Sequence, residues 1–93
     1  MEDSPEYAWL RELVRRRGSE LRRRFGAHGI GVARKRVGGR PTDTPALVLY
    51  VERKGPGPEQ VPPAIEFTPA GRDRPVRLAT DVVESPPFEL EDE

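Results

Sequence analysis

Proline and glycine limit what this chain can fold into more than any other feature of its sequence. Eleven prolines and nine glycines stand among 93 residues, so much of the chain must form turns and ends. They are densest over residues 55–63, GPGPEQVPP, which can be neither helix nor central strand. We expect an extended, polyproline-like connector there. A chain of this length forms one domain, and we expect that domain to span residues 1–85, with the connector inside it.

One helix is predicted near the N-terminus. Ser4, Pro5 and Glu6 are typical of a helix start, with a serine cap, a proline at the first helical position and an acid in the first turn. Apolar residues then recur at helical spacing in one narrow stripe. The stripe consists of Tyr7, Leu10, Leu13, Val14, Leu21 and Phe25. Gly18 predicts a kink or a break within the helix, and Gly26 predicts its end.

Two pairs of strands are predicted after the helix. Residues 30–37 form a strand whose second half emerges into solvent, residues 38–45 a turn-rich loop, and residues 46–51 the most apolar strand. A continuous apolar run of this length is typical of a strand covered on both faces. Residues 65–67 and 76–83 form a second hairpin, with Val76, Leu78, Thr80 and Val82 on one face.

These elements predict an α+β fold. One N-terminal helix packs on a small, mostly antiparallel sheet of three or four strands, in which the 46–51 strand is central. Residues 28–38, 46–53 and 76–83 carry most of the core. From residue 86 onward the acidic end lacks periodicity, so residues 86–93 are predicted to be a mobile tail.

Several classes of protein are excluded by residue counts. The chain has no cysteine and one histidine, which excludes a disulfide scaffold, a thiol zinc site and a histidine-rich metal site. No run approaches the ~20 apolar residues of a membrane span. The acidic N-terminus has no apolar segment after it, so we expect a cytoplasmic protein that does not bind membranes. Asparagine is absent, and arginine outnumbers lysine fourteen to two, a composition that resembles those of thermophile proteins.

The sequence offers no catalytic constellation. His28 has no cysteine or serine partner in a suitable context and is interpreted as a turn histidine. Residues 26–29, GAHG, match the four-residue glycine signature of KH domains, but they stand between a helix and a strand rather than between two helices. We therefore expect no catalytic residue, no cofactor and no metal.

Charge is segregated along the chain although the net charge is zero. Residues 11–40 hold eleven bases against Glu12 and Glu20, and residues 80–93 hold six acids and no base. A basic surface of this kind can bind nucleic acid or another polyanion. The candidate residues are Arg15, Arg16, Arg22, Arg23, Arg34, Arg36 and Arg40. Against this alternative, the region lacks the stacking aromatic residues of single-strand binders.

A family resemblance covers residues 26–84. Residues 29–56, GIGVARKRVGGRPTDTPALVLYVERKGP, together with VPP at 61–63 and VRLATDVVE at 76–84, resemble the leader segment that precedes the catalytic domain of many bacterial trypsin-like serine peptidases. The peptidase domain itself is absent from this sequence, and no catalytic residue of that family maps onto it. The resemblance implies an interaction or assembly unit rather than an enzyme.

The leading hypothesis is therefore a non-catalytic protein-interaction or assembly module. A single helix covers a sheet face poorly, and an apolar sheet face left exposed would attract a partner protein or a second copy of the chain. We expect a homo-oligomer or a protein complex, with polyanion binding as the alternative.

Overall fold

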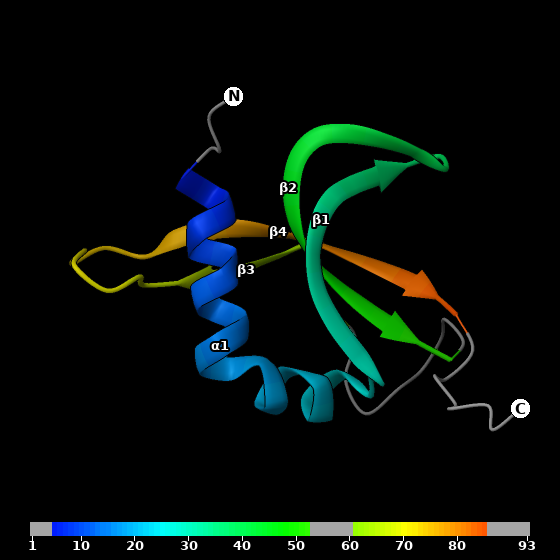
Figure 1. The fold of residues 1–93 in the computed structure, drawn as a ribbon, viewed down its shortest axis with the longest axis horizontal. Coiled ribbons are helices and arrows are strands. Elements are labelled where there is room, and N and C mark those ends of the chain that lie inside the picture. The colour runs from blue at the N-terminus through cyan, green and yellow to red at the C-terminus, as the bar shows by residue number, and fades with distance from the viewer. Residues whose placement is uncertain (1–4, 53–60, 86–93) are drawn as a thin grey trace, which may run out of the picture.

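The computed structural model describes residues 5–52 and 61–85. These ranges contain one helix and four strands: α1 (Pro5–Phe25), β1 (Gly29–Val37), β2 (Arg40–Val51), β3 (Ala64–Phe67) and β4 (Val76–Glu84) (Figure 1). The strands form one sheet in the order β1-β2-β4-β3. The β1–β2 and β3–β4 pairs are antiparallel, and β2–β4 is parallel. The predicted α+β fold is confirmed, with β2 central; the Ser4 cap, residues 53–60 of the connector and the 86–93 tail lie outside the described residues.

Helix α1 runs unbroken through Gly18, and its axis bends along the way (Figure 1). It ends where the sequence predicts. Gly26 has a φ of 68°, in the left-handed region that favours glycine, and the Ala27 N–H donates to the Arg22 carbonyl oxygen at 2.9 Å. This is the 6→1 hydrogen bond that is typical of a Schellman cap. The cap ends the helix and directs the chain into β1.

Residues 40–45 are strand, so the prediction of a loop over them is wrong. Only Gly38 and Gly39 form the turn, with φ values of 60° and 81° that suit the two-residue turn of a tight hairpin. Pro41 and Pro45 lie in the part of β2 that pairs with β1 alone, since β4 joins from Ala46 onward. Proline is tolerated in a strand with one open side.

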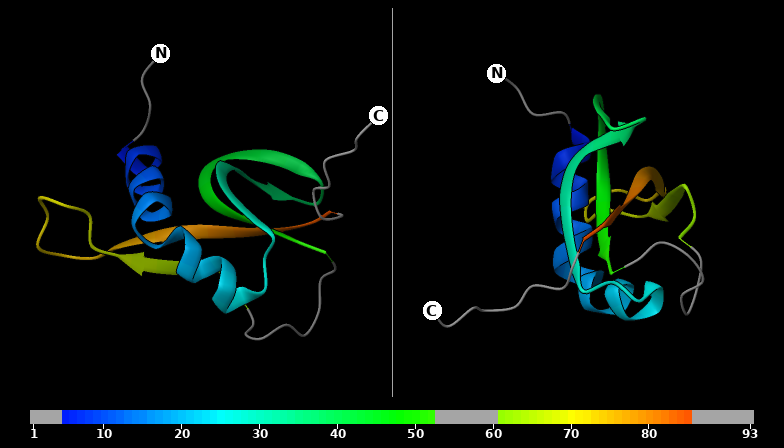
Figure 2. Two further views of the ribbon diagram at one scale, coloured as in Figure 1. Left: turned by 60° about the horizontal axis from the view of Figure 1, so that its bottom comes forward. Right: turned by 90° about the vertical axis from the view of Figure 1, so that its right-hand side faces the viewer.

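The β1–β2 hairpin curls back over the sheet (Figure 2). The Lys35 Nζ donates to the Thr80 carbonyl oxygen at 2.7 Å, and the Arg36 N–H donates to Asp81 Oδ2 at 2.9 Å. Both bonds tie the far half of β1 to β4, two strands away in the sheet order. The hairpin therefore bends the sheet toward a half-barrel.

The curl of the hairpin determines how much of the second face of the sheet, the face opposite α1, is exposed to solvent. On β2, Leu47 and Leu49 face the helix, and Ala46 and Val48 point the other way; all four are buried. The prediction that this strand is covered on both faces is confirmed. The exposed apolar sheet face that we expected is not found in the described part of the chain, where Val37 is the one large hydrophobic residue that is strongly exposed, at 60%.

The core lies between α1 and the first sheet face, as the helical stripe predicts. It consists of Leu10, Leu13, Leu21 and Phe25 from α1 with Leu47, Leu49, Phe67 and Leu78 from the sheet. Thr80 is also buried on this face, and its hydroxyl donates to the Pro62 carbonyl oxygen. Buried hydroxyl groups are normally hydrogen-bonded. This contact therefore holds the segment just before β3 against β4.

Truncating the centre of this core will destabilise the domain. Leu49 is fully buried, so Leu49→Ala should lower the free energy of unfolding by about 2–5 kcal/mol through lost burial and a residual cavity. The exposed Val37→Ala variant is the control and should change it by less than about 0.5 kcal/mol. Urea titration followed by Trp9 fluorescence measures both, and equal effects would contradict the assigned core.

Candidate interaction surfaces

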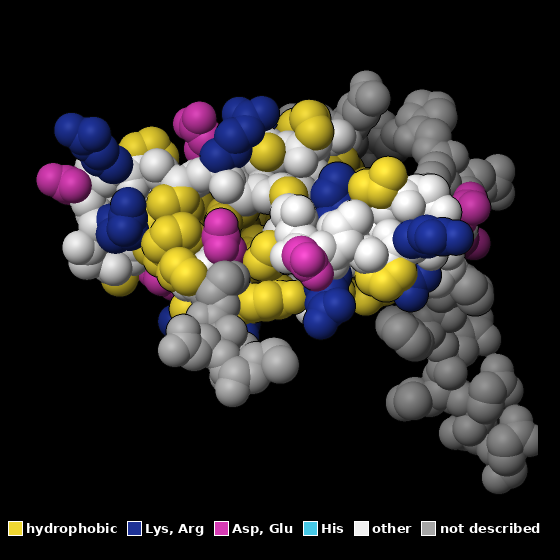
Figure 3. Space-filling view, turned by 90° about the horizontal axis from the view of Figure 1, so that it is seen from above, with side chains coloured by type: hydrophobic (Ala, Val, Ile, Leu, Met, Phe, Trp, Pro, Cys, Tyr) yellow, Lys and Arg dark blue, Asp and Glu magenta, His cyan; other side chains and the backbone are white. Residues whose placement is uncertain are grey.

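The structure divides the seven predicted polyanion-binding arginines into separate groups. Arg22 and Arg23 lie in the last turn of α1, whereas Arg34, Arg36 and Arg40 lie near the turn of the β1–β2 hairpin. The end of α1 lies at the bottom of Figure 1 and the hairpin turn at the upper right, so the two groups are well separated. Figure 3 shows one face, on which basic side chains alternate with acidic and hydrophobic ones. Because Arg22 and Arg23 belong to the end of α1 and the other three belong to the hairpin, the described arginines form separate groups.

Part of the helix charge is neutralised locally. Arg16 pairs with Glu12 at 2.8 Å, and its guanidinium lies 5.1 Å from the centre of the Phe67 ring. Arg17 pairs with Glu20 at 3.2 Å, and this pair lowers the pKa of Glu20. Arg15, Arg22 and Arg23 are exposed. All four helix candidates are exposed, but Arg16 is also paired with Glu12 and lies over the Phe67 ring.

Two contacts anchor α1 to the turn between β3 and β4. Glu12 accepts a hydrogen bond from the Ala70 N–H at 2.8 Å, and this bond, together with the bond from Arg16, lowers the pKa of the Glu12 carboxyl. Nearby, the Arg72 guanidinium lies 5.0 Å from the centre of the Trp9 ring. Glu12 therefore has a structural role, which its helical spacing from Arg16 does not reveal.

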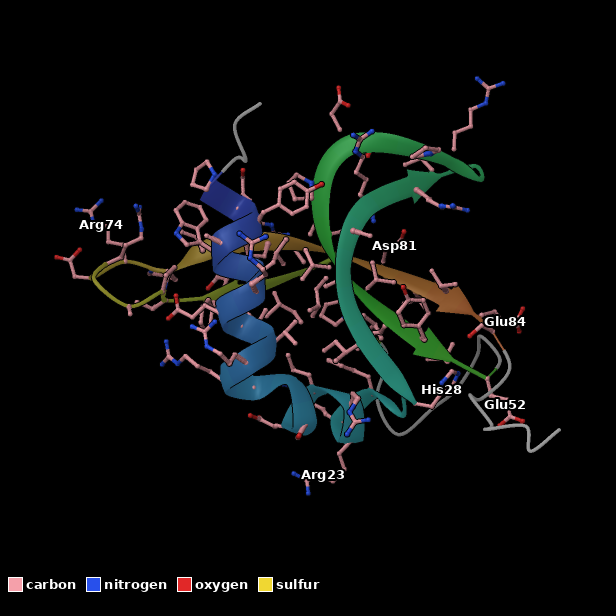
Figure 4. All side chains as sticks on the ribbon, in the orientation of Figure 1. Arg23, His28, Glu52, Arg74, Asp81 and Glu84 are labelled. Atoms are coloured by element: carbon pink, nitrogen blue, oxygen red, sulfur yellow. The ribbon has the colours of Figure 1, made fainter. Side chains whose placement is uncertain are left out.

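His28 stands between the helix and β1, as the turn interpretation predicts. Its Nε2 lies 3.0 Å from the Ser85 carbonyl oxygen and donates to it, so the proton is on this nitrogen. Its backbone N–H donates to the Tyr50 carbonyl oxygen at 2.8 Å, and the Ser85 N–H donates to the Val51 carbonyl oxygen at 2.8 Å. His28 thereby holds the end of β4 beside the start of β1, as its position beside Glu84 in Figure 4 illustrates.

Neither a cluster of metal-ligating side chains nor a membrane-spanning helix is found in the described residues. Across residues 5–52 and 61–85, no three histidine or acidic side chains gather where they could hold a metal ion. No helix in these ranges has the length and apolar character needed to cross a membrane. The Asp81 carboxylate accepts a hydrogen bond from the Arg36 backbone N–H at 2.9 Å.

The sheet has two edges of unequal length. At one edge lies β3, with four residues, and at the other lies β1, with nine. Along β1, Gly29, Gly31 and Ala33 occupy the second face, while Ile30 and Val32 pack against the core and are only half-buried. A register shift between Arg34 and Arg36 interrupts the strand beyond this segment. We define residues 29–33 as the β1 edge.

Sequence reasoning did not find the β1 edge, because strand order depends on contacts between distant residues. The alternation of small residues with Ile30 and Val32 was visible in the sequence, and it was the only available signal. Comparison with known proteins gave no match to a protein-family model or to a curated protein.

The role of Glu12 can be tested through pH. Because its pKa is lowered in the folded state, the ionised carboxylate stabilises the fold above the ordinary pKa of 4.5, and this contribution is lost as pH falls through the folded-state value. Glu12→Gln should therefore lower the melting temperature at pH 7 and have little effect at pH 3. The exposed Glu66→Gln serves as control. If Glu12→Gln lowered the melting temperature by the same amount at both pH values, the charge of the Glu12 carboxylate would not be what stabilises the fold.

Proposed function

We propose that this chain is a non-catalytic, cytoplasmic protein-interaction or assembly module that accepts an extended segment at the β1 edge. The observation that carries the proposal is the position of β1 as the longer, outer strand of the sheet. An edge strand presents backbone N–H and C=O groups that a further strand can pair with. A second copy of the chain is one such partner, which would give a homo-oligomer.

The side chains of the β1 edge favour such pairing. On the second face Ala33 is exposed, whereas Gly29 and Gly31 lie against the Tyr50 ring. On the face toward the core, Ile30 and Val32 would gain cover from an added strand. Beyond them, the register shift and the charges of Arg34 to Arg36 oppose further pairing, as is common at protected edges. An incoming strand would therefore pair over about five residues.

The resemblance to a leader segment of trypsin-like peptidases supports the same proposal. A module that precedes a catalytic domain without supplying catalytic residues is suited to binding a partner or positioning a neighbour. This support is an analogy between sequences and adds no residue to the site.

A charge placed on the β1 edge should block this interaction. Ala33 is exposed, so Ala33→Lys should leave the fold intact and lower self-association or partner affinity at least tenfold. Glu66→Lys, on the β3 edge, is the matched control. Sedimentation velocity on the purified chain, and pull-down followed by titration for a captured partner, measure the effect. A strictly monomeric chain at high micromolar concentration would remove self-association, and equal loss in both variants would remove the β1 edge as the site.

Polyanion binding is the second candidate. It is supported by the exposed Arg22 and Arg23 at the end of α1 and by the exposed Arg34, Arg36 and Arg40 on the hairpin. Arginine suits phosphate contacts because its guanidinium can donate two parallel hydrogen bonds. The separation of the two groups means that a short nucleic acid would contact only one of them at a time.

Salt and charge reversal test this candidate. If a phosphate backbone binds at the helix end, the affinity for a short labelled duplex should fall steeply with salt, and Arg22→Glu with Arg23→Glu should lower it at least tenfold. Arg34→Glu with Arg36→Glu is the matched reversal at the hairpin and should have the smaller effect. Affinity that is indifferent to salt would refute polyanion binding, and a larger hairpin effect would move the site there.

A further inference from the structure

The backbone hydrogen bonds of β2 alternate between its two neighbours in the sheet. The Tyr50 carbonyl oxygen accepts from the His28 N–H, on the β1 side, and the Val51 carbonyl oxygen accepts from the Ser85 N–H, on the β4 side. Successive residues of a strand direct their backbone groups to opposite sides. Every second residue of β2, counted back from Val51, therefore directs its backbone groups to β4.

This alternation leaves the backbone groups of two β1 residues on the outer side. Ile30 and Val32 stand opposite Leu49 and Leu47, which are two of the β2 residues that face β4. The N–H and C=O groups of Ile30 and Val32 therefore point away from β2. In the described part of the chain no further strand pairs on that side of β1. These are the groups that an added strand would bond.

Apolar side chains border these groups on the face that α1 covers. Ile30 and Val32 are half-buried against the core. Gly18 brings the helix close to them, since a Cβ built on Gly18 would lie 3.5 Å from Val14 and 3.7 Å from Ile30. Val14 is itself half-buried. A strand with apolar side chains at two alternate positions would cover Ile30 and Val32 on this face.

Exposed arginines stand at both ends of this apolar border. Arg34 directly follows the β1 edge and shares the face of its apolar residues, because alternate residues of a strand point to one side. At the other end, the Ala27 N–H donates to the Arg22 carbonyl oxygen at 2.9 Å, so the last turn of α1 lies beside the chain that enters β1. Glu84 ends β4 and Glu52 follows β2, so both acids belong to strands further from the outer side.

We propose that the β1 edge binds an extended acidic segment of another protein. In this segment two apolar residues at alternate positions lie beside Ile30 and Val32, and acids at the next alternate positions lie near Arg22 and Arg34. The inference rests on the proposed function, which takes the β1 edge as a strand acceptor, and it names the chemistry of the partner. Because both ends of the edge are basic, the same pattern fits a parallel or an antiparallel strand.

The same bases oppose a second copy of this chain as the occupant. In a parallel pair of matching residues, Arg34 of one copy would lie beside Arg34 of the other. In an antiparallel pair centred on Gly31, Arg34 of each copy would approach the end of α1, which carries Arg22. Like charges on neighbouring strands destabilise a sheet, whereas opposite charges stabilise it. An acidic segment meets opposite charges at both ends and is therefore favoured over self-pairing.

Labelled peptides titrated against the full chain test the proposed pattern. Glu-Ser-Ile-Ser-Val-Ser-Glu carries it, and Lys-Ser-Ile-Ser-Val-Ser-Lys reverses its charges. Glu-Ile-Ser-Ser-Ser-Val-Glu keeps its composition but places the apolar residues on the face opposite the acids. By fluorescence anisotropy, the first peptide should bind at least tenfold more tightly than either of the other two.

Charge reversal on the chain should reverse the preference. Arg22→Glu with Arg34→Glu should bind the lysine peptide more tightly than the acidic one. Arg74→Glu with Arg77→Glu is the matched control, since both residues are exposed and Arg74 lies at the far end of the sheet from His28 (Figure 4). This control should keep the preference of the unaltered chain for the acidic peptide.

Each other outcome overturns the inference. Equal affinity for the acidic and lysine peptides would remove the role of charge, and if Ala33→Lys weakened both, the proposed strand acceptance would still stand. Equal affinity for the acidic peptide and its rearranged form would mean attraction of charges without strand pairing. If no peptide bound but the chain self-associated and Ala33→Lys abolished this, a second copy would be the occupant. If no peptide bound and the chain stayed monomeric, both the inference and self-pairing would fail.

Discussion

The curl of the β1–β2 hairpin over β4 is the constraint on which the rest of the structure depends. One helix can cover one face of a sheet, and the second face of β2 would otherwise expose Ala46 and Val48 to water. The bonds from Lys35 to the Thr80 carbonyl and from the Arg36 backbone to Asp81 hold the hairpin across that face. Within the described residues, both faces of the central strand are thus buried by one helix and the curled hairpin. In this arrangement β1 is an outer strand of the sheet. The hairpin that covers the second face of β2 therefore also provides the β1 edge.

Much of the charge on this chain has a structural role that a count of basic residues conceals. Glu12 and Arg16 connect α1 to the β3–β4 turn and to Phe67, and Lys35 reaches a backbone carbonyl of β4. Surface ion pairs contribute little by themselves, but a carboxylate that accepts a backbone N–H also satisfies a donor in a turn. What remains exposed is two smaller arginine groups, one at the end of α1 and one near the turn of the β1–β2 hairpin. A single large basic face, as the sequence suggests, would favour polyanion binding more strongly than this arrangement does.

The local features of the fold were predictable, and the long-range ones were not. Gly26 and the apolar stripe define α1 correctly, because capping and helical periodicity are properties of neighbouring residues. The extension of β2 back to Arg40 was not predicted, because Pro41 and Pro45 are typical of a loop. They are compatible with a strand here because this part of β2 pairs with β1 only, and the sequence does not reveal that pairing. The parallel β2–β4 pair and the separation of Arg22 from Arg36 depend on strand order, which no local pattern encodes. The β1 edge was missed for the same reason.

A strand that paired at the β1 edge would be held by backbone hydrogen bonds and by apolar cover of Ile30 and Val32. Salt would weaken neither contribution strongly, because neither depends on a pair of charged side chains. Phosphate contacts at the exposed arginines, by contrast, would release counterions and weaken as salt rises. The salt dependence of binding therefore separates the two proposed functions, since strand pairing would persist at salt concentrations that abolish polyanion binding.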